Sequence, residues 1–411
     1  MGIPVVTVSS KKYYYVFWFI VGSLSFCLTN PCHSGELSGH AGLEARISNH
    51  HVPNKNHDNI GYSALVDTEF YHDWDEGRQR ISINSFLRVD KENNERSHVD
   101  FREFYWSYGF DEKAFDLYVG LRIVFWGVTE SLHLVDVINQ IDLLEGIDTE
   151  DKLGQPMVQL SWEKEWGNLD LFYLPYFRER NFSGLNTPLT TTAVVDTYKA
   201  KYQSGSENWH PDIAVRWSQT RANWDVGLVY FYGTNREPIL WVDQTSAQPV
   251  LLPHYNILRQ ISIDIQYTTD SWLWKLEALN RSSNGQQSSA FVGGFEYTFF
   301  DVYESGIDVG FISEFQYDDI SGEIQHVGDN DIATGARLTF NDTSDTNLLA
   351  LSTVDIDTGV QFYTLELDRR IGYNWQIELQ ARFFVGGDNN TLPFNIFDKK
   401  DSFQLTMRYF F

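Results

Sequence analysis

The stretch WQIELQARF, residues 375–383, alternates apolar and polar side chains without a break. The stretches ISIDIQY at 261–267 and FQLTMRY at 403–409 follow the same period of two. Because successive side chains of a β-strand point to opposite faces, each stretch predicts a strand with one apolar and one polar face. The pattern recurs from residue 38 onward, and we therefore expect an all-β protein.

Eighteen segments of this kind can be counted, with sixteen as the alternative count. They begin near residues 38, 60, 79, 98, 115, 156, 168, 211, 223, 257, 271, 289, 306, 331, 346, 359, 373 and 401. Short connections such as 75–77 alternate with mostly longer ones such as 128–155 and 181–209. This alternation predicts a closed transmembrane antiparallel β-barrel, with short periplasmic turns, long outer loops and both termini in the periplasm. A soluble β-sandwich is the alternative, but it does not explain the alternating loop lengths.

The first residues have the pattern of a secretory signal. Lys11 and Lys12 precede the apolar run 13–28, and small residues follow near position 34. We therefore expect a cleaved signal peptide at 1–34 and a single barrel domain at 35–411. Removal of this segment takes away two lysines and no acid, which leaves 29 basic against 56 acidic residues and a net charge of −27.

Composition excludes several functional classes. The whole chain of 411 residues carries a net charge of −25, which disfavours nucleic acid as a partner. No apolar run after residue 30 approaches the roughly 18 residues that a membrane helix needs. Four tryptophans lie beside predicted short turns, at the alternate positions that form the apolar face of each strand. A periplasmic aromatic belt is expected there. They are Trp166, Trp224, Trp272 and Trp375.

The end of the chain resembles the terminal strand that Gram-negative barrel proteins present to their assembly machinery. The residues that carry this resemblance are Phe403, Leu405, Met407, Tyr409 and Phe411. The stretch FWGVTESLHLVD at 125–136 resembles a segment of porin-like outer-membrane proteins of proteobacteria, an uncharacterised family. These resemblances imply a place in the outer membrane of a Gram-negative bacterium, with membrane lipid and the barrel assembly machinery as partners.

Strand parity assigns charged side chains to the lumen, where they would set the ion preference of a pore. Pairing that merely satisfies a polar interior is the alternative role. The predicted pore-lining residues are Arg88, Arg122, Arg178, Arg216, Arg337, Arg382, Glu296, Asp308, Glu314 and Glu378.

The connection 128–155 has apolar residues at roughly helical spacing, among them Leu132, Val135 and Ile138, which predicts a partly helical loop. Five acids follow them: Asp142, Glu145, Asp148, Glu150 and Asp151. A loop folded inward as a constriction is our expectation, and an external flap over the rim is the alternative.

These features predict a porin-like channel for the passive passage of small hydrophilic solutes, with a modest cation preference. Acids outnumber bases both in the predicted loop and on the inward parity, and a narrow passage focuses their field. A barrel-type envelope hydrolase and a polysaccharide exporter are the alternatives, and we expect no enzymatic activity. No motif predicts a cofactor or a metal, and a homo-oligomer is left open.

Overall fold

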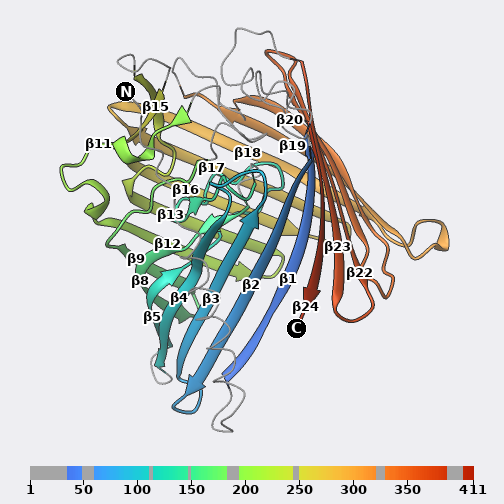
Figure 1. The fold of residues 1–411 in the computed structure, drawn as a ribbon, viewed down its shortest axis with the longest axis horizontal. Helices are drawn as coiled ribbons and strands as arrows, with labels where there is room; N and C mark the ends of the chain where they lie inside the picture. Colours follow the sequence, from blue (N-terminus) through green and yellow to red (C-terminus); the bar gives the residue numbers. More distant parts are fainter. Residues whose placement is uncertain are drawn as a thin grey trace, which may run out of the picture.

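The computed structural model describes residues 35–48, 60–110, 114–146, 150–182, 194–243, 250–320, 329–386 and 401–411. Eighteen antiparallel strands form one sheet, which closes because β1 (Gly35–Ser48) pairs with β24 (Ser402–Phe410), as Figure 1 shows. The expected all-β barrel of eighteen strands is confirmed. Between β1 and β24 the wall contains β2 (Ile60–Trp74), β3 (Gln79–Asp90), β4 (His98–Phe110), β5 (Phe115–Arg122), β8 (Gln155–Lys164), β9 (Gly167–Leu174), β12 (Asp212–Arg221), β13 (Trp224–Thr234), β16 (Ile257–Thr268), β17 (Trp272–Ser283), β18 (Gln286–Phe299), β19 (Asp308–Asp318), β20 (Asn330–Thr339), β21 (Asn347–Asp355), β22 (Gln361–Ile371) and β23 (Trp375–Val385).

The two ends of the barrel differ in their connections. At one end, which we call the turn end, residues 75–78 join β2 to β3 and residues 372–374 join β22 to β23. The other, which we call the loop end, carries long connections such as 123–154 and 175–211. The first strand begins and the last strand finishes at the turn end, since Gly35 pairs with His72 near the β2–β3 turn and Phe411 bonds Gly39.

Small elements occupy the loop-end connections. β10 (Val194–Val195), β11 (Lys201–Tyr202), β14 (Ile239–Asp243) and β15 (Val250–Tyr255) form a four-stranded sheet, and β6 (Gln140–Ile141) pairs with β7 (Lys152–Leu153). Two short 3-10 helices of the described residues, η1 (Thr197–Lys199) and η2 (Glu207–Trp209), lie in the same loop-end connections. A third, η3 (Val302–Glu304), lies in the turn-end connection between β18 and β19. Among the described residues, no helix has the length and apolar character needed to cross a membrane.

The outer face of the barrel is apolar. In β13, Trp224, Leu228 and Tyr230 are exposed, while Val229 and Phe231, on the opposite face of the strand, are buried. The four tryptophans expected beside short turns are all exposed on this outer face, which agrees with an aromatic belt at the turn end. So large an exposed apolar surface is stable in hydrocarbon, where the closed sheet leaves its backbone groups satisfied.

The inner face is polar along some strands only. On β8, β9, β12, β13 and β16, inward-facing apolar side chains pack against the connection 123–154 and form a core. This core contains Trp126, Val135, Val137 and Ile138 of the connection and Met157, Phe172, Leu174, Ala214, Val229, Phe231 and Leu258 of the wall. The expectation that the inward parity is polar throughout is therefore wrong for these five strands, because the folded loop shields that face from water.

Candidate functional site

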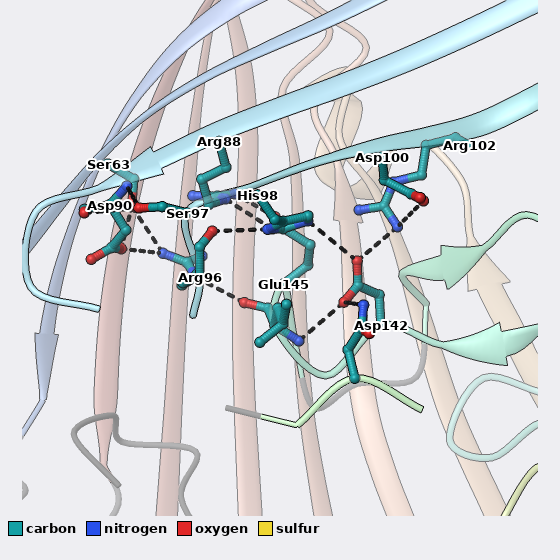
Figure 2. A network of polar contacts seen from close by, with 12 residues as sticks. Ser63, Arg88, Asp90, Arg96, Ser97, His98, Asp100, Arg102, Asp142 and Glu145 are labelled. Carbon is teal, nitrogen blue, oxygen red and sulfur yellow. Dashed lines mark hydrogen bonds and ion pairs between the residues drawn. The ribbon is translucent and has the colours of Figure 1, made fainter. Parts of the chain in front are cut away.

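Three arginines of the wall and one of a neighbouring connection meet the acidic segment 142–146 of the β5–β8 connection. Arg46 comes from β1, Arg88 from β3, Arg102 from β4, and Arg96 from the β3–β4 connection. We call these four residues the arginine cluster, and Figure 2 shows three of them with their partners. Because Arg46, Arg88 and Arg102 belong to the inner wall, their contacts hold the loop inside the barrel. The external flap is therefore excluded for this segment.

Glu44 and Glu145 are the acids that the cluster neutralises. Arg88 binds Glu145 at two points, with Nε 2.9 Å from Oε1 and Nη2 in contact with Oε2. Arg88 Nη1 lies 2.8 Å from Glu44 Oε2, and Arg96 Nη1 lies 2.6 Å from Glu44 Oε1. Arg96 also donates from Nε to the Leu144 carbonyl at 2.8 Å. None of these ionised side chains is more than 6% exposed, so each charge is paired away from water.

Asp142 is the second attachment point of the loop. Its Oδ2 accepts a hydrogen bond of 2.8 Å from Arg102 Nη1, which also donates to the Lys152 carbonyl at 3.0 Å. Burial by itself would raise the pKa of the Asp142 carboxyl, but His98 and the Arg102 guanidinium outweigh it and hold that pKa well below its usual range. The carboxylate is therefore charged at neutral pH.

A β-bulge places Arg102 at this point. The register between β3 and β4 passes from Glu103 opposite Asn84 to Phe101 opposite Ser85, so Arg102 is the extra residue. An extra residue breaks the simple alternation of a strand and redirects a side chain. This is why strand parity alone did not predict Arg102 as an inward-facing residue.

Two wall carboxylates bind the opposite part of the connection. Glu277 of β17 and Glu314 of β19 accept hydrogen bonds of 2.8 to 3.1 Å from the backbone N–H groups of Val128, Thr129, Glu130, Ser131 and Val135. These amides therefore bond to the wall rather than to a preceding turn of helix. The expected partly helical loop is thus wrong for residues 128–146 and 150–155, in which no helix occurs.

A cavity of about 500 Å³ lies between the acidic segment and the wall strands β1–β4 and β22–β24. We call it the acidic passage, because eight carboxylates and three guanidinium groups line it. These are Glu44, Asp67, Glu145, Glu150, Asp151, Glu366, Asp368 and Glu378, against Arg88, Arg102 and Arg408. The apolar core fills the interior beside β8–β16, so the passage lies off-centre.

The predicted pore-lining residues fall into two groups. Arg88 and Glu378 line the acidic passage, and Glu378 pairs with Arg408. Most of the others have partners elsewhere. Arg122 packs over Tyr118, Arg178 binds Asp100, Arg216 binds Asp264, Glu314 holds the loop, and Arg337 lies between Glu130 and Glu296. Arg382 is buried, and Asp308 accepts hydrogen bonds from Asp301 and Asn341 at a turn-end connection.

The five predicted constriction acids also differ in where they lie. Glu145, Glu150 and Asp151 line the passage, whereas Asp142 is fully buried against Arg102. Asp148 lies outside the described residues.

Sequence reasoning missed several residues of the site: Glu44, Arg46, Asp67, Arg96, Arg102 and Asp368. Glu44, Asp67 and Asp368 stand on the inward parity of predicted strands, so a fuller parity count was the available signal. The apolar core could also have been predicted from the sequence. Every residue of Leu228–Tyr232 is apolar or aromatic, as in a strand that is covered on both faces.

No protein-family model matches the chain, and no curated protein sequence does. Among solved structures, OmpT, an outer membrane protein of Vibrio cholerae in its trimer form, is 9% identical over 92% of this chain and 99% of that one, with a TM-score of 0.47. A mutant of the Rh. blastica porin is 12% identical over 92% of this chain and 100% of its own, with a TM-score of 0.44. Since both TM-scores lie below 0.5, the class assignment rests on the strand pairing above.

The closed antiparallel sheet, its apolar exterior and its polar passage define a porin-like outer-membrane β-barrel protein. Barrels of this kind belong to the outer membrane of Gram-negative bacteria, and that is where we place this chain.

Proposed function

We propose that the protein is a channel for the passive passage of small hydrophilic solutes, with a modest preference for cations. The acidic passage carries this proposal, because its eight carboxylates exceed its three guanidinium groups. A passage lined by one excess sign of charge, between walls of low dielectric constant, concentrates ions of the opposite sign.

The charges differ in how far they are neutralised. Glu145 is paired with Arg88, whereas Asp67 accepts a hydrogen bond from the Asn84 amide at 3.2 Å and Asp368 accepts one from the Gln376 amide at 3.1 Å. An amide carries no net charge, so these two carboxylates are less neutralised than Glu145. They are the acids to which we assign the cation preference.

Reversal potentials in planar bilayers test this proposal. Each charge about 8 Å from the path is worth about 0.5 kcal/mol at a dielectric constant of 80, and salt screening roughly halves that. The two charges together are worth about 0.5 kcal/mol to a cation and the same with opposite sign to an anion, so the double variant Asp67→Asn/Asp368→Asn should lower the cation-to-anion permeability ratio roughly fivefold. The matched control is Glu76→Gln/Asp345→Asn, which neutralises two exposed acids in turns.

The possible results test the cation preference and the channel separately. An unchanged ratio in the Asp67/Asp368 variant would remove the cation preference and leave the channel. Absence of conductance in the wild-type protein would contradict the channel itself and favour a hydrolase or an exporter. We propose no enzymatic activity, since the buried acids Glu44, Asp142 and Glu145 are bound by arginines that hold the loop.

The orientation and maturation of the chain belong to the same proposal. Both ends of the described barrel lie at the turn end, which supports periplasmic termini. The alternate residues Phe403, Leu405, Met407 and Tyr409 face outward on β24, which supports their role as an assembly signal. The proposed signal peptide 1–34 lies outside the described residues, and the mass of the mature protein tests it. A homo-oligomer stays a prediction.

A further inference from the structure

Three aspartates converge at the loop end of β20 and β21, away from the acidic passage. Asp331 and Asp355 are direct partners across the β20–β21 ladder, and Asp329 immediately precedes β20. One carboxylate oxygen from each residue lies within 4.8 Å of the other two. Asp331 and Asp355 are each only 3% exposed.

This arrangement is unfavourable without a counter-charge. Like charges directly opposite each other in a ladder destabilise the pair, and buried carboxylates lose their hydration. A cation bound among the three carboxylates would offset this repulsion and the loss of hydration.

Asp355 shows the direction in which a ligand would lie. Its Oδ1 accepts hydrogen bonds from the N–H groups of Asp357 at 2.8 Å and Thr358 at 2.9 Å, which fixes the carboxylate. Its Oδ2 is buried and has no hydrogen-bond partner among the described residues. The Oδ1 of Asp329 is buried in the same way. Two buried carboxylate oxygens of this cluster thus have no hydrogen-bond donor among the described residues.

We propose that Asp329, Asp331 and Asp355 bind a divalent cation, and that calcium is the ion that fits. Calcium takes six to eight oxygen ligands at about 2.3–2.6 Å in irregular geometry, so oxygens on opposite sides of it lie about 4.6–5.2 Å apart. Magnesium demands near-ideal octahedral geometry, which carboxylates fixed on two strands do not adapt to readily. Water would complete the calcium shell. The ion would cross-link the loop-end termini of β20 and β21.

Calcium titration of the full-length protein in detergent, after treatment with EDTA, tests the site. Calorimetry should give one calcium per barrel in the wild type, and calcium should raise the temperature at which the barrel unfolds, because a ligand that binds the folded state stabilises it. Asp355→Asn keeps an oxygen for the turn but removes a charge, so this variant should lose at least tenfold in affinity. Without calcium it should unfold at a higher temperature than the wild type.

The matched control is Asp345→Asn, at the other end of the same strands, which should bind calcium as the wild type does. Asp329→Asn, which lies in a connection rather than in a strand, replaces Asp355→Asn if that variant fails to fold. A wild-type protein that neither binds calcium nor gains thermal stability from it would overturn the proposal. Equal binding by the wild type and Asp355→Asn would overturn it too. Neither result depends on conductance, so this site and the proposed channel fail independently.

Discussion

Removing the Arg88 guanidinium should release the acidic segment of the folded loop. Arg88 bridges Glu44 and Glu145, and neither acid is more than 6% exposed. Loss of one partner from a buried ion pair costs about 3–5 kcal/mol, because the remaining charge is left without its counter-ion. Glu44 keeps Arg96 at 2.6 Å, so the loss falls on Glu145, whose carboxylate otherwise has only the His98 imidazole, at 3.8 Å, as an ion-pair neighbour among the described residues.

The free-energy cost gives the ratio of released to inward positions of the loop segment. Since about 1.4 kcal/mol corresponds to a factor of ten, the inward position of the segment is disfavoured by roughly 150- to 4000-fold relative to the wild type. The neighbouring part of the connection should stay in place, because Val135 and Ile138 are fully buried in the apolar core. We therefore expect local detachment of the segment around Glu145, with Asp142 still held by Arg102, and no unfolding of the barrel.

Single-channel recording measures this release. The wild type should show one steady conductance level, and Arg88→Met should switch between that level and a larger one. Arg408→Met is the matched control, because Arg408 lines the same passage but pairs with Glu378 of the wall. Both variants lose one positive charge, so greater cation preference should be common to both and switching specific to Arg88→Met. A steady wild-type level in Arg88→Met would show that apolar packing alone holds the loop, and would refute this reasoning.

Further expectations concern the lipid face, the core and pH. Leu379→Arg should cost about 2–4 kcal/mol if the side chain lies near the middle of the bilayer, measured by refolding into vesicles, whereas Arg at the inward Gln380 should cost far less. Ile138→Ala should cost about 2–5 kcal/mol because Ile138 is fully buried, and thermal unfolding should show little change for the exposed control Ile356→Ala. The depressed pKa of Asp142 means that its ionised form stabilises the folded loop above an unfolded-state pKa of about 3.9, and that this contribution is lost as pH falls through the folded value. Conductance recorded against pH should stay steady down to about pH 5 and become unsteady only below about pH 4; instability at neutral pH would contradict this assignment.

Local patterns determined the barrel. A period of two along each strand is a property of neighbouring residues, so stretches such as 375–383 and 261–267 predicted their strands correctly. Connection lengths are also written directly in the chain, and they predicted which end of the barrel carries the turns. The four tryptophans beside those turns followed from the same parity.

Only the tertiary structure decided how the interior is divided. Glu44 and Glu145 lie about one hundred residues apart in the chain, and the same arginine joins them because the loop returns to the first strands. The direct pairing of Asp331 with Asp355 depends on the register of two strands, and the bulge at Arg102 breaks the parity on which sequence reasoning relies. Such contacts depend on closure and register, whereas periodicity reports only which face of its own strand a residue occupies.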